Sequence, residues 1–581
     1  MRSNVSISGE QSNHIPWNVK IGTGLFILGL LALIYDFKFR DIEYMRVYAF
    51  VGMLIGCLLF TFNTHQKRFR FLYSQSLNFT QLIGAGISIS GLSILLLAWI
   101  GFHFAQNTLF FSLAIGGIGC GTLLFTYGSY AHHPKGIKNN YVWFNSLTNR
   151  GLLGWIAGIL LTGFYVQLYW YADSLKELIN LFHPLSELLR NKEADQWFVY
   201  GTMYTFVILF LGVKFIVKYR HNKYQLYRTI VVIVSQTILA YLLPSILESM
   251  NEGVGYFGKD LKNVWPLNYY FTESWSLDNM TKPQNAGPSG TFYFVWGLLL
   301  FLVVTPLLTY WVGKRWYCSW VCGCGGLAET AGDSFRHLSS KKQSAWKLER
   351  WLIHLVMVFV LVMTIATLWP YFSGKDYHIG ILTITKKSYY IYTVLLLSIS
   401  AFGLALLGKK WNNSILYIGS SLLVLIGVLL SVAFFSGTKD IFYIDSKSIK
   451  NVYGFFIGSA FSGVIGVGFY PILGNRVWCR FGCPMAGYMG IFQRFKSKFR
   501  ITTNGSQCIS CGNCSTYCEQ GIDVRAYAQK GENIVRSSCV GCGICSAVCP
   551  RGVLKLENGP EKGRFEPNPL VISKDGVSLN M

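Results

Sequence analysis

The chain has 581 residues, of which 52% are hydrophobic and only 13% charged, and its mean hydropathy is +0.37. This composition excludes an ordinary water-soluble globular protein. The net charge of +24 does not indicate nucleic-acid binding, because the basic residues are spread over many loops without a binding motif, so we expect no nucleic-acid partner.

Long apolar runs with few charges recur along the chain, and runs of about 18 or more apolar residues are typical of membrane spans. We predict a polytopic α-helical membrane protein with about 12 transmembrane helices and lipid as its surrounding partner. The first run contains Lys20, near enough to its end for the side chain to reach the interface. The predicted spans are residues 17–35, 47–63, 82–104, 109–129, 152–172, 196–217, 229–247, 291–312, 351–372, 389–407, 414–436 and 453–474.

The distribution of lysine and arginine predicts how these spans are oriented, because cytoplasmic loops keep an excess of both. Every second loop is basic, and the intervening loops are mostly uncharged or acidic, although one of them contains Lys375, Lys386 and Lys387. With twelve spans, both termini are expected in the cytoplasm. The basic residues of the loops expected there include Lys67, Arg68, Arg70, Lys135, Lys138, Arg150, Lys218, Arg220, Lys223, Arg228, Lys409 and Lys410.

Residues 1–250 are predicted to form an N-terminal bundle of seven helices without any metal-ligand pattern. One group near the expected outer face combines aromatic rings with an amide, as a quinone site requires. An aromatic belt at the membrane interface explains the same side chains. The group consists of Tyr165, Gln167, Tyr169 and Trp170. An extracytoplasmic loop is expected over residues 251–290.

Residues 291–490 form a membrane region in which two spans each run into a C-x₃-C motif after an arginine and an aromatic residue. Cysteines four positions apart share one face of a helical turn, so each pair can offer two thiolates to one centre. A cubane iron–sulfur cluster normally takes four thiolates, so we predict one shared cluster at the cytoplasmic membrane face. Two iron-free dithiols are the alternative. The predicted ligands are Cys318, Cys322, Cys479 and Cys483, with Cys324 as a possible substitute and Arg315 and Arg476 as thiolate-stabilising cations.

Residues 491–560 carry eight cysteines in two copies of C-x₂-C-x₂-C-x₃-C, the second followed by Pro550. This run folds around [4Fe–4S] clusters in bacterial ferredoxins, where the fourth cysteine of each run ligates the other cluster. We therefore predict a cytoplasmic α+β ferredoxin-like domain with two clusters. Zinc ribbons and disulfides fit this register less well. The predicted ligands are Cys508, Cys511, Cys514 and Cys549 for cluster 1, and Cys539, Cys542, Cys545 and Cys518 for cluster 2. Residues 561–581 are predicted to be a polar tail.

Membrane spans followed by C-x₃-C-P and a two-cluster ferredoxin domain resemble the polyferredoxin-type membrane proteins of the NosR, NapH and CcoG group. The resemblance covers roughly residues 291–555 and is strongest from Cys479 to Pro484. It implies a bacterial inner-membrane protein that passes electrons between a quinol pool or partner reductase and cytoplasmic clusters. The first motif departs from the group because Gly323 replaces its proline. Covalent flavin is not expected, because the loop before residue 291 offers only Pro288-Ser289-Gly290-Thr291, which does not match the flavin-attachment motif.

Three functions are consistent with these patterns. The favoured one is an electron conduit, and the alternatives are a membrane redox sensor and a redox-driven transporter. The transporter hypothesis is disfavoured, because no acid or base lies deep in any predicted span, where ion pathways usually need one. No nucleophile, triad or acid/base pair is evident, so we expect an electron-transfer component rather than a stand-alone catalyst.

Overall fold

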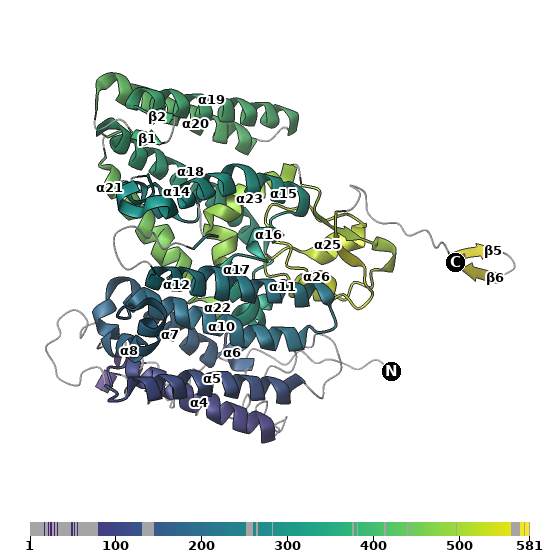
Figure 1. The fold of residues 1–581 in the computed structure, drawn as a ribbon. Helices are drawn as coiled ribbons and strands as arrows, with labels where there is room; N and C mark the ends of the chain where they lie inside the picture. Colours follow the sequence, from purple (N-terminus) through teal and green to yellow (C-terminus); the bar gives the residue numbers. More distant parts are fainter. Residues whose placement is uncertain are drawn as a thin grey trace.

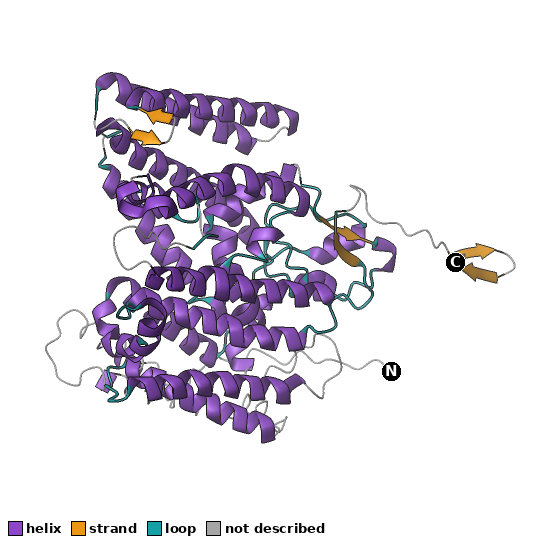
Figure 2. Ribbon diagram, viewed as in Figure 1, coloured by secondary structure: helices purple, strands orange, loops and turns teal. Residues whose placement is uncertain are grey.

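The computed structural model describes residues 79–130, 145–250, 260–262 and 265–558, with short gaps, together with the strand residues 570–573 and 576–579 and scattered positions between 17 and 55. The described part is mostly helical (Figure 2). Long helices lie side by side, and the cysteine-rich C-terminal part lies at one end of them (Figure 1).

The N-terminal half is a bundle of long helices, and α4 and α5 form an antiparallel pair at its edge (Figure 1). Its core includes Leu168, Leu178, Leu181 and Phe182. Its elements are α4 (Phe79–Trp99), α5 (Asn107–Tyr130), α6 (Asn145–Thr148), α7 (Leu152–Trp170), η2 (Ala172–Leu175), α8 (Lys176–Leu181), α9 (His183–Arg190), α10 (Gln196–Lys218), α11 (Lys223–Val234), η3 (Ser235–Leu242) and α12 (Leu243–Met250).

The second half contains both membrane cysteine motifs, each on short elements that follow a helical segment. The loop predicted over residues 251–290 includes helix α13 and the start of α14. The elements are η4 (Tyr269–Thr272), α13 (Ser274–Thr281), α14 (Pro283–Leu299), η5 (Leu300–Val304), α15 (Thr305–Val312), α16 (Arg315–Cys318), α17 (Gly323–Thr330), η6 (Ala331–Leu338), α18 (Gln343–Gly374), β1 (Tyr377–Ile379), β2 (Leu382–Ile384), α19 (Lys386–Trp411), α20 (Ser414–Ser436), α21 (Ser446–Tyr453), η7 (Gly454–Ile465), α22 (Tyr470–Leu473), η8 (Trp478–Gly482) and α23 (Pro484–Phe495).

The C-terminal part is a small α+β unit around the eight ferredoxin-type cysteines. Strands β3 and β4 pair antiparallel with Arg500 opposite Glu557, and Ile534 bridges to Ile501. Phe215 and Tyr219 at the end of α10 belong to the same hydrophobic core, so the unit packs directly on the membrane part. The elements are β3 (Arg500–Thr503), η9 (Gly505–Gln507), α24 (Asn513–Thr516), α25 (Val524–Lys530), α26 (Ile544–Ala547), β4 (Leu554–Glu557) and the hairpin β5 (Leu570–Ser573) with β6 (Gly576–Leu579).

Within the described residues, nine helices are long and apolar enough to cross a membrane, and they correspond to the third to eleventh predicted spans. The first two predicted spans lie outside the described residues apart from scattered positions. The twelfth, 453–474, was wrong as one continuous helix. There η7 ends at Ile465 and a turn precedes α22, in a segment that contains Gly466, Gly468 and Pro471.

Candidate iron–sulfur sites

The two membrane C-x₃-C motifs share one local structure. Each follows a glycine with positive φ, Gly313 at 71° and Gly474 at 98°, where the preceding helix ends. In the first motif the backbone N–H of Cys322 donates to the carbonyl of Tyr317 at 2.8 Å. In the second, the N–H of Cys483 donates to Trp478 at 2.9 Å. The two C-x₃-C motifs therefore share a backbone conformation as well as a sequence pattern.

In both motifs the second cysteine precedes the first residue of a helix, in extended conformation, with ψ of 126° for Cys322 and 114° for Cys483. The free N–H groups of a helix start stabilise negative charge, which favours a thiolate there. The N–H of Ala486 donates to Cys483 Sγ at 3.4 Å. A hydrogen bond from Cys324 lowers the pKa of Cys322 to about 6, although burial opposes this shift.

The structure brings the cysteines of the two C-x₃-C motifs, together with Cys324, into one packed core beside Trp316 and Trp478. A close backbone approach holds the first motif together: a Cβ on Gly325 would lie 2.1 Å from the carbonyl oxygen of Cys318, so only glycine fits. We call this group the membrane cysteine site. Its members are Cys318, Cys322, Cys324, Cys479 and Cys483. Five soft sulfur donors suit iron rather than hard cations.

The cations beside this site differ from those predicted. Arg476 donates to Cys479 Sγ at 3.5 Å and to the carbonyl of Cys318 at 3.3 Å, as expected of a thiolate-stabilising residue. Arg315 instead lies over the ring of Phe499, 4.7 Å from its centroid. The first motif has Lys314 in its place. Burial raises the pKa of Cys318 to about 12, and Lys314 acts against that rise.

A buried network of ion pairs adjoins the membrane cysteine site and was not predicted. Arg476 pairs with Glu329 at 2.6 Å and with Glu519 at 3.0 Å. Arg336, which is fully buried, pairs with both carboxylates, and Arg228 pairs with Glu329 at 2.8 Å. Arg336 also pairs with Asp333 at 2.7 Å, and Asp333 pairs with Lys218 at 2.5 Å. The connected network thus holds four cationic side chains and three carboxyl groups, so the cations outnumber the carboxyl groups by one.

The network holds Glu329 ionised. Burial alone would raise the pKa of Glu329, but Arg228, Arg336 and Arg476 lower it below its ordinary value. Burial raises the pKa of Glu519, against the opposing effect of Arg476. Both carboxyl groups lie within 4.8 Å of Cys542 Sγ. Since arginines pair with both, the arrangement is an ionic support for the neighbouring cysteines rather than a separate metal site.

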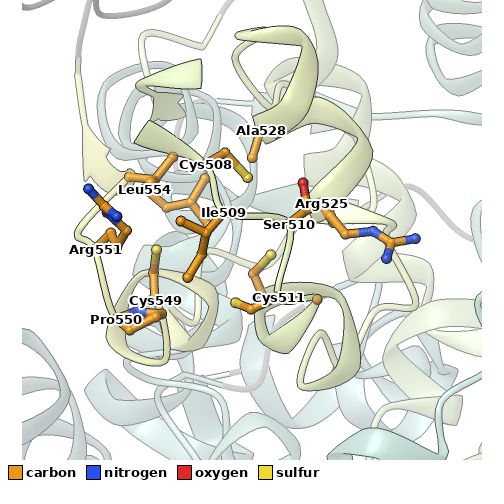
Figure 3. Close-up of a pocket in the computed structure, with 13 residues that line it drawn as sticks. Cys508, Ile509, Ser510, Cys511, Arg525, Ala528, Cys549, Pro550, Arg551 and Leu554 are labelled. Atoms are coloured by element: carbon orange, nitrogen blue, oxygen red, sulfur yellow. The ribbon is translucent and has the colours of Figure 1, made fainter. Parts of the chain in front are cut away.

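The four cysteines predicted for cluster 1 line one hollow in the ferredoxin unit. Figure 3 shows Cys508, Cys511 and Cys549 around it, and Cys514 is the fourth. Burial raises the pKa of Cys514 to about 11, and the thiols of Cys549, Cys511 and Cys508 add to the rise. The hollow includes the fourth cysteine of the second run, as the crossed assignment requires, and its donor set fits an iron–sulfur cluster.

For cluster 2, the structure brings three of the predicted thiols together. Burial raises the pKa of Cys545, and Cys539 and Cys518 add to the rise as near neighbours. The thiol of the fourth, Cys542, packs against the same core and lies within 4.8 Å of the carboxyl groups of Glu329 and Glu519. Cys542 packs against the ferredoxin core and also against the membrane cysteine site, so it lies between them.

The quinone candidates and the two remaining cysteines lie in other surroundings. Among the quinone candidates, Tyr165 is buried and stacks with Tyr169, with ring centroids 6.2 Å apart, and Gln167 accepts a hydrogen bond from Trp99. Cys120 is exposed on α5 and belongs to neither of the two cores that hold the other described cysteines, and Cys57 lies outside the described residues.

Comparison with known families agrees with both sulfur-rich regions. A 4Fe-4S dicluster domain matches residues 500–550, and a 4Fe-4S binding domain matches residues 295–344 and 456–502, once on each membrane motif. Together with the folded cysteine motifs, these matches define a membrane iron–sulfur protein: the motifs bind [4Fe–4S] clusters, and the nine apolar helices make it a multi-pass membrane protein.

One relative is "Putative electron transport protein YccM" of Escherichia coli (strain K12), which is 25% identical to this chain over 235 residues. These residues are 39% of this chain and 46% of the relative, so the match spans less than half of either protein. No solved structure matches the chain. The family matches thus show a protein with 4Fe–4S binding domains, and the relative that shares part of its sequence carries the name of an electron transport protein.

Proposed function

We propose that the chain passes electrons at the cytoplasmic face of a bacterial inner membrane. The electrons move between quinol or a partner reductase and two ferredoxin-type clusters. In this proposal the membrane cysteine site holds a third cluster, and both termini are cytoplasmic. A [4Fe–4S] cluster bound at each set of cysteines supplies uptake and release of one electron. The proposal extends the likeness to the NosR, NapH and CcoG group, and support for a respiratory reductase or its maturation follows from that likeness.

The observation that carries the proposal is the direct packing of the membrane cysteine site on the second ferredoxin run. Ser319, inside the first C-x₃-C motif, donates to the carbonyl of Val540 at 2.8 Å. Cys542 packs against both groups of cysteines. Close and continuous packing supports electron exchange between neighbouring centres, because electron tunnelling falls steeply with distance.

Buried charge supports the same reading. Four thiolates and a cluster are anionic, and isolated buried anions are costly. The ammonium of Lys314 is buried and, in the described part of the chain, has one hydrogen bond, 3.3 Å to the carbonyl of Ala486, and no carboxylate partner. Together with Arg476 it supplies positive charge beside the membrane cysteine site. A bound anionic cluster would give Lys314 its counter-charge, whereas Arg476 already pairs with Glu329 and Glu519.

The proposal is tested by EPR on the full chain in lipid nanodiscs during a potentiometric titration, followed by mixing with a quinol analogue. We expect signals from three centres, and re-reduction by quinol within milliseconds after oxidation. Cys318→Ser should remove one signal and slow the reduction of the other two. If all signals persist in that variant and quinol reduces none of them, the conduit proposal fails.

A further inference from the structure

The two ferredoxin loops, residues 508–512 and 539–543, have the same backbone but opposite surroundings. Ser510 and Gly541 share a positive φ, 58° and 66°, and Gly512 and Gly543 share another, 78° and 76°. The residues after the first cysteines differ sharply in exposure, since Ile509 is 55% exposed and Val540 only 1%. One loop therefore faces solvent while its copy is covered.

Side chains of the membrane part cover the second loop at nearly every carbonyl. Tyr224 donates to Gly541 at 2.8 Å, and Gln225 and Arg228 each donate to Cys542 at 2.9 Å. Gln493 donates to Cys539 at 2.6 Å. This loop has no free surface for a soluble partner, so exchange through it is internal.

The first loop has no comparable cover in the described residues. The hydrogen bond to the side chain of Ser510 comes from Gln529, inside the ferredoxin unit, at 2.7 Å. Cys511 is exposed, as are Ile509 and Pro550 at the mouth of the hollow. The loop around the cluster 1 cysteines is therefore the part of the iron–sulfur system that an outside molecule can approach.

The rim of this hollow is basic. Among its 13 lining residues the charged ones are Arg525 and Arg551, which lie on two sides of it in Figure 3. Both are exposed, and neither forms an ion pair with another described residue. Ile509 and Pro550 give an apolar patch beside them. An apolar centre with arginines beside it is typical of protein interfaces, and the charge favours an acidic partner.

We infer that the exposed face around Ile509, Arg525 and Arg551 is the docking surface for a small, acidic, soluble one-electron carrier protein. The inference rests on the proposed function, since it gives cluster 1 an exchange partner. One electron passes per encounter between the carrier's reduced centre and the oxidised cluster, and no bond or proton is transferred. Arg525 and Arg551 attract the acidic carrier through their charge, and Ile509 makes an apolar contact with it. Association should therefore be fast and salt-sensitive, and the small contact should keep the complex weak.

The test uses the full chain in neutral-lipid nanodiscs and an oxidised acidic plant-type [2Fe–2S] ferredoxin as the probe. Binding is measured by interferometry at low and high salt. We expect Arg525→Glu combined with Arg551→Glu to weaken binding about tenfold or more at low salt, with the difference vanishing at high salt. Arg220→Glu is the matched control, because Arg220 is an exposed arginine outside the rim, and it should bind like the parent.

Equal binding by the parent and the double variant would overturn the inference. So would a parent that ignores the ferredoxin but binds vesicles of anionic lipid through the same two arginines, since that makes the rim a headgroup contact. Iron and acid-labile sulfide are measured on the same preparations. If iron is present but ferredoxin binding does not depend on the two arginines, the docking surface alone is rejected. If the iron is missing, the proposed function is rejected.

Discussion

Replacement of Arg476 by methionine tests the role of the buried network. The guanidinium is fully buried and bonds to Glu329, Glu519, Cys479 Sγ and the carbonyl of Cys318. Removing one partner of a buried ion pair costs about 3–5 kcal/mol, because the other charge stays buried. Each carboxyl group keeps its bond to Arg336, so we expect the lower end, about 3 kcal/mol.

The assay is equilibrium unfolding of the full chain in mixed micelles of increasing SDS fraction, followed by tryptophan fluorescence, with iron content measured in parallel. Glu519→Gln completes a double-mutant cycle. Because Arg476 and Glu519 are in direct contact, we expect the two losses to be non-additive by about 1–3 kcal/mol. Arg494→Met is the control, because among the described residues Arg494 bonds only to the carbonyl of Val535, in an exposed position, and the change should cost under about 0.5 kcal/mol.

The reasoning is refuted if Arg476→Met unfolds at the same SDS fraction as the parent and keeps its iron. It is also refuted if the two single losses simply add, because the contact would then contribute nothing. Loss of iron with unchanged stability would assign Arg476 to the cysteine site alone and remove the structural part of the argument.

The remaining predictions concern single cysteines and one glycine. Cys549→Ser should lower the iron held by the first ferredoxin run, measured by EPR of the separate signals; loss of the other signal instead would reject the crossed assignment. In iron-free protein, alkylation of Cys322 should rise as the pH passes about 6, since only the thiolate reacts, and Cys324→Ala should move that inflection to higher pH; an unchanged inflection contradicts the hydrogen bond. Gly325→Ala should abolish iron binding at the membrane cysteine site, because its Cβ would lie 2.1 Å from the carbonyl of Cys318; normal iron content would show that the backbone relaxes.

The sequence was sufficient to predict the membrane-spanning helices, because these depend on long runs of apolar residues. Nine of the predicted spans correspond to helices, because about 20 apolar residues can fold in lipid only as a helix with its own backbone bonds satisfied. The twelfth failed because hydropathy does not register a helix break, and Gly466 and Gly468 have the same apolar character as a continuing helix. The sequence also shows that the C-x₃-C motif is repeated. The repeat includes the glycine five residues before each motif, Gly313 and Gly474, because both glycines adopt a positive φ.

The electrostatics around the sites could not be predicted from spacing. Arg315 and Arg476 occupy the same place in the repeat, yet one lies over Phe499 and the other contacts Cys479, because only the second motif faces Glu329 and Glu519. These carboxylates lie far apart in the chain and resemble isolated charges near span ends. Their position directly after cysteine motifs was the available signal: Glu519 follows Cys518, and Glu329 lies five residues beyond Cys324.

The most direct test of the central claim is the count of iron and acid-labile sulfide in the full chain, purified without oxygen, with Mössbauer spectra to identify the clusters. Three [4Fe–4S] clusters predict about twelve irons per chain, and Cys479→Ser should reduce this to about eight while the ferredoxin signals remain. About eight irons in both proteins would contradict a cluster at the membrane cysteine site and leave its five thiols as iron-free redox groups.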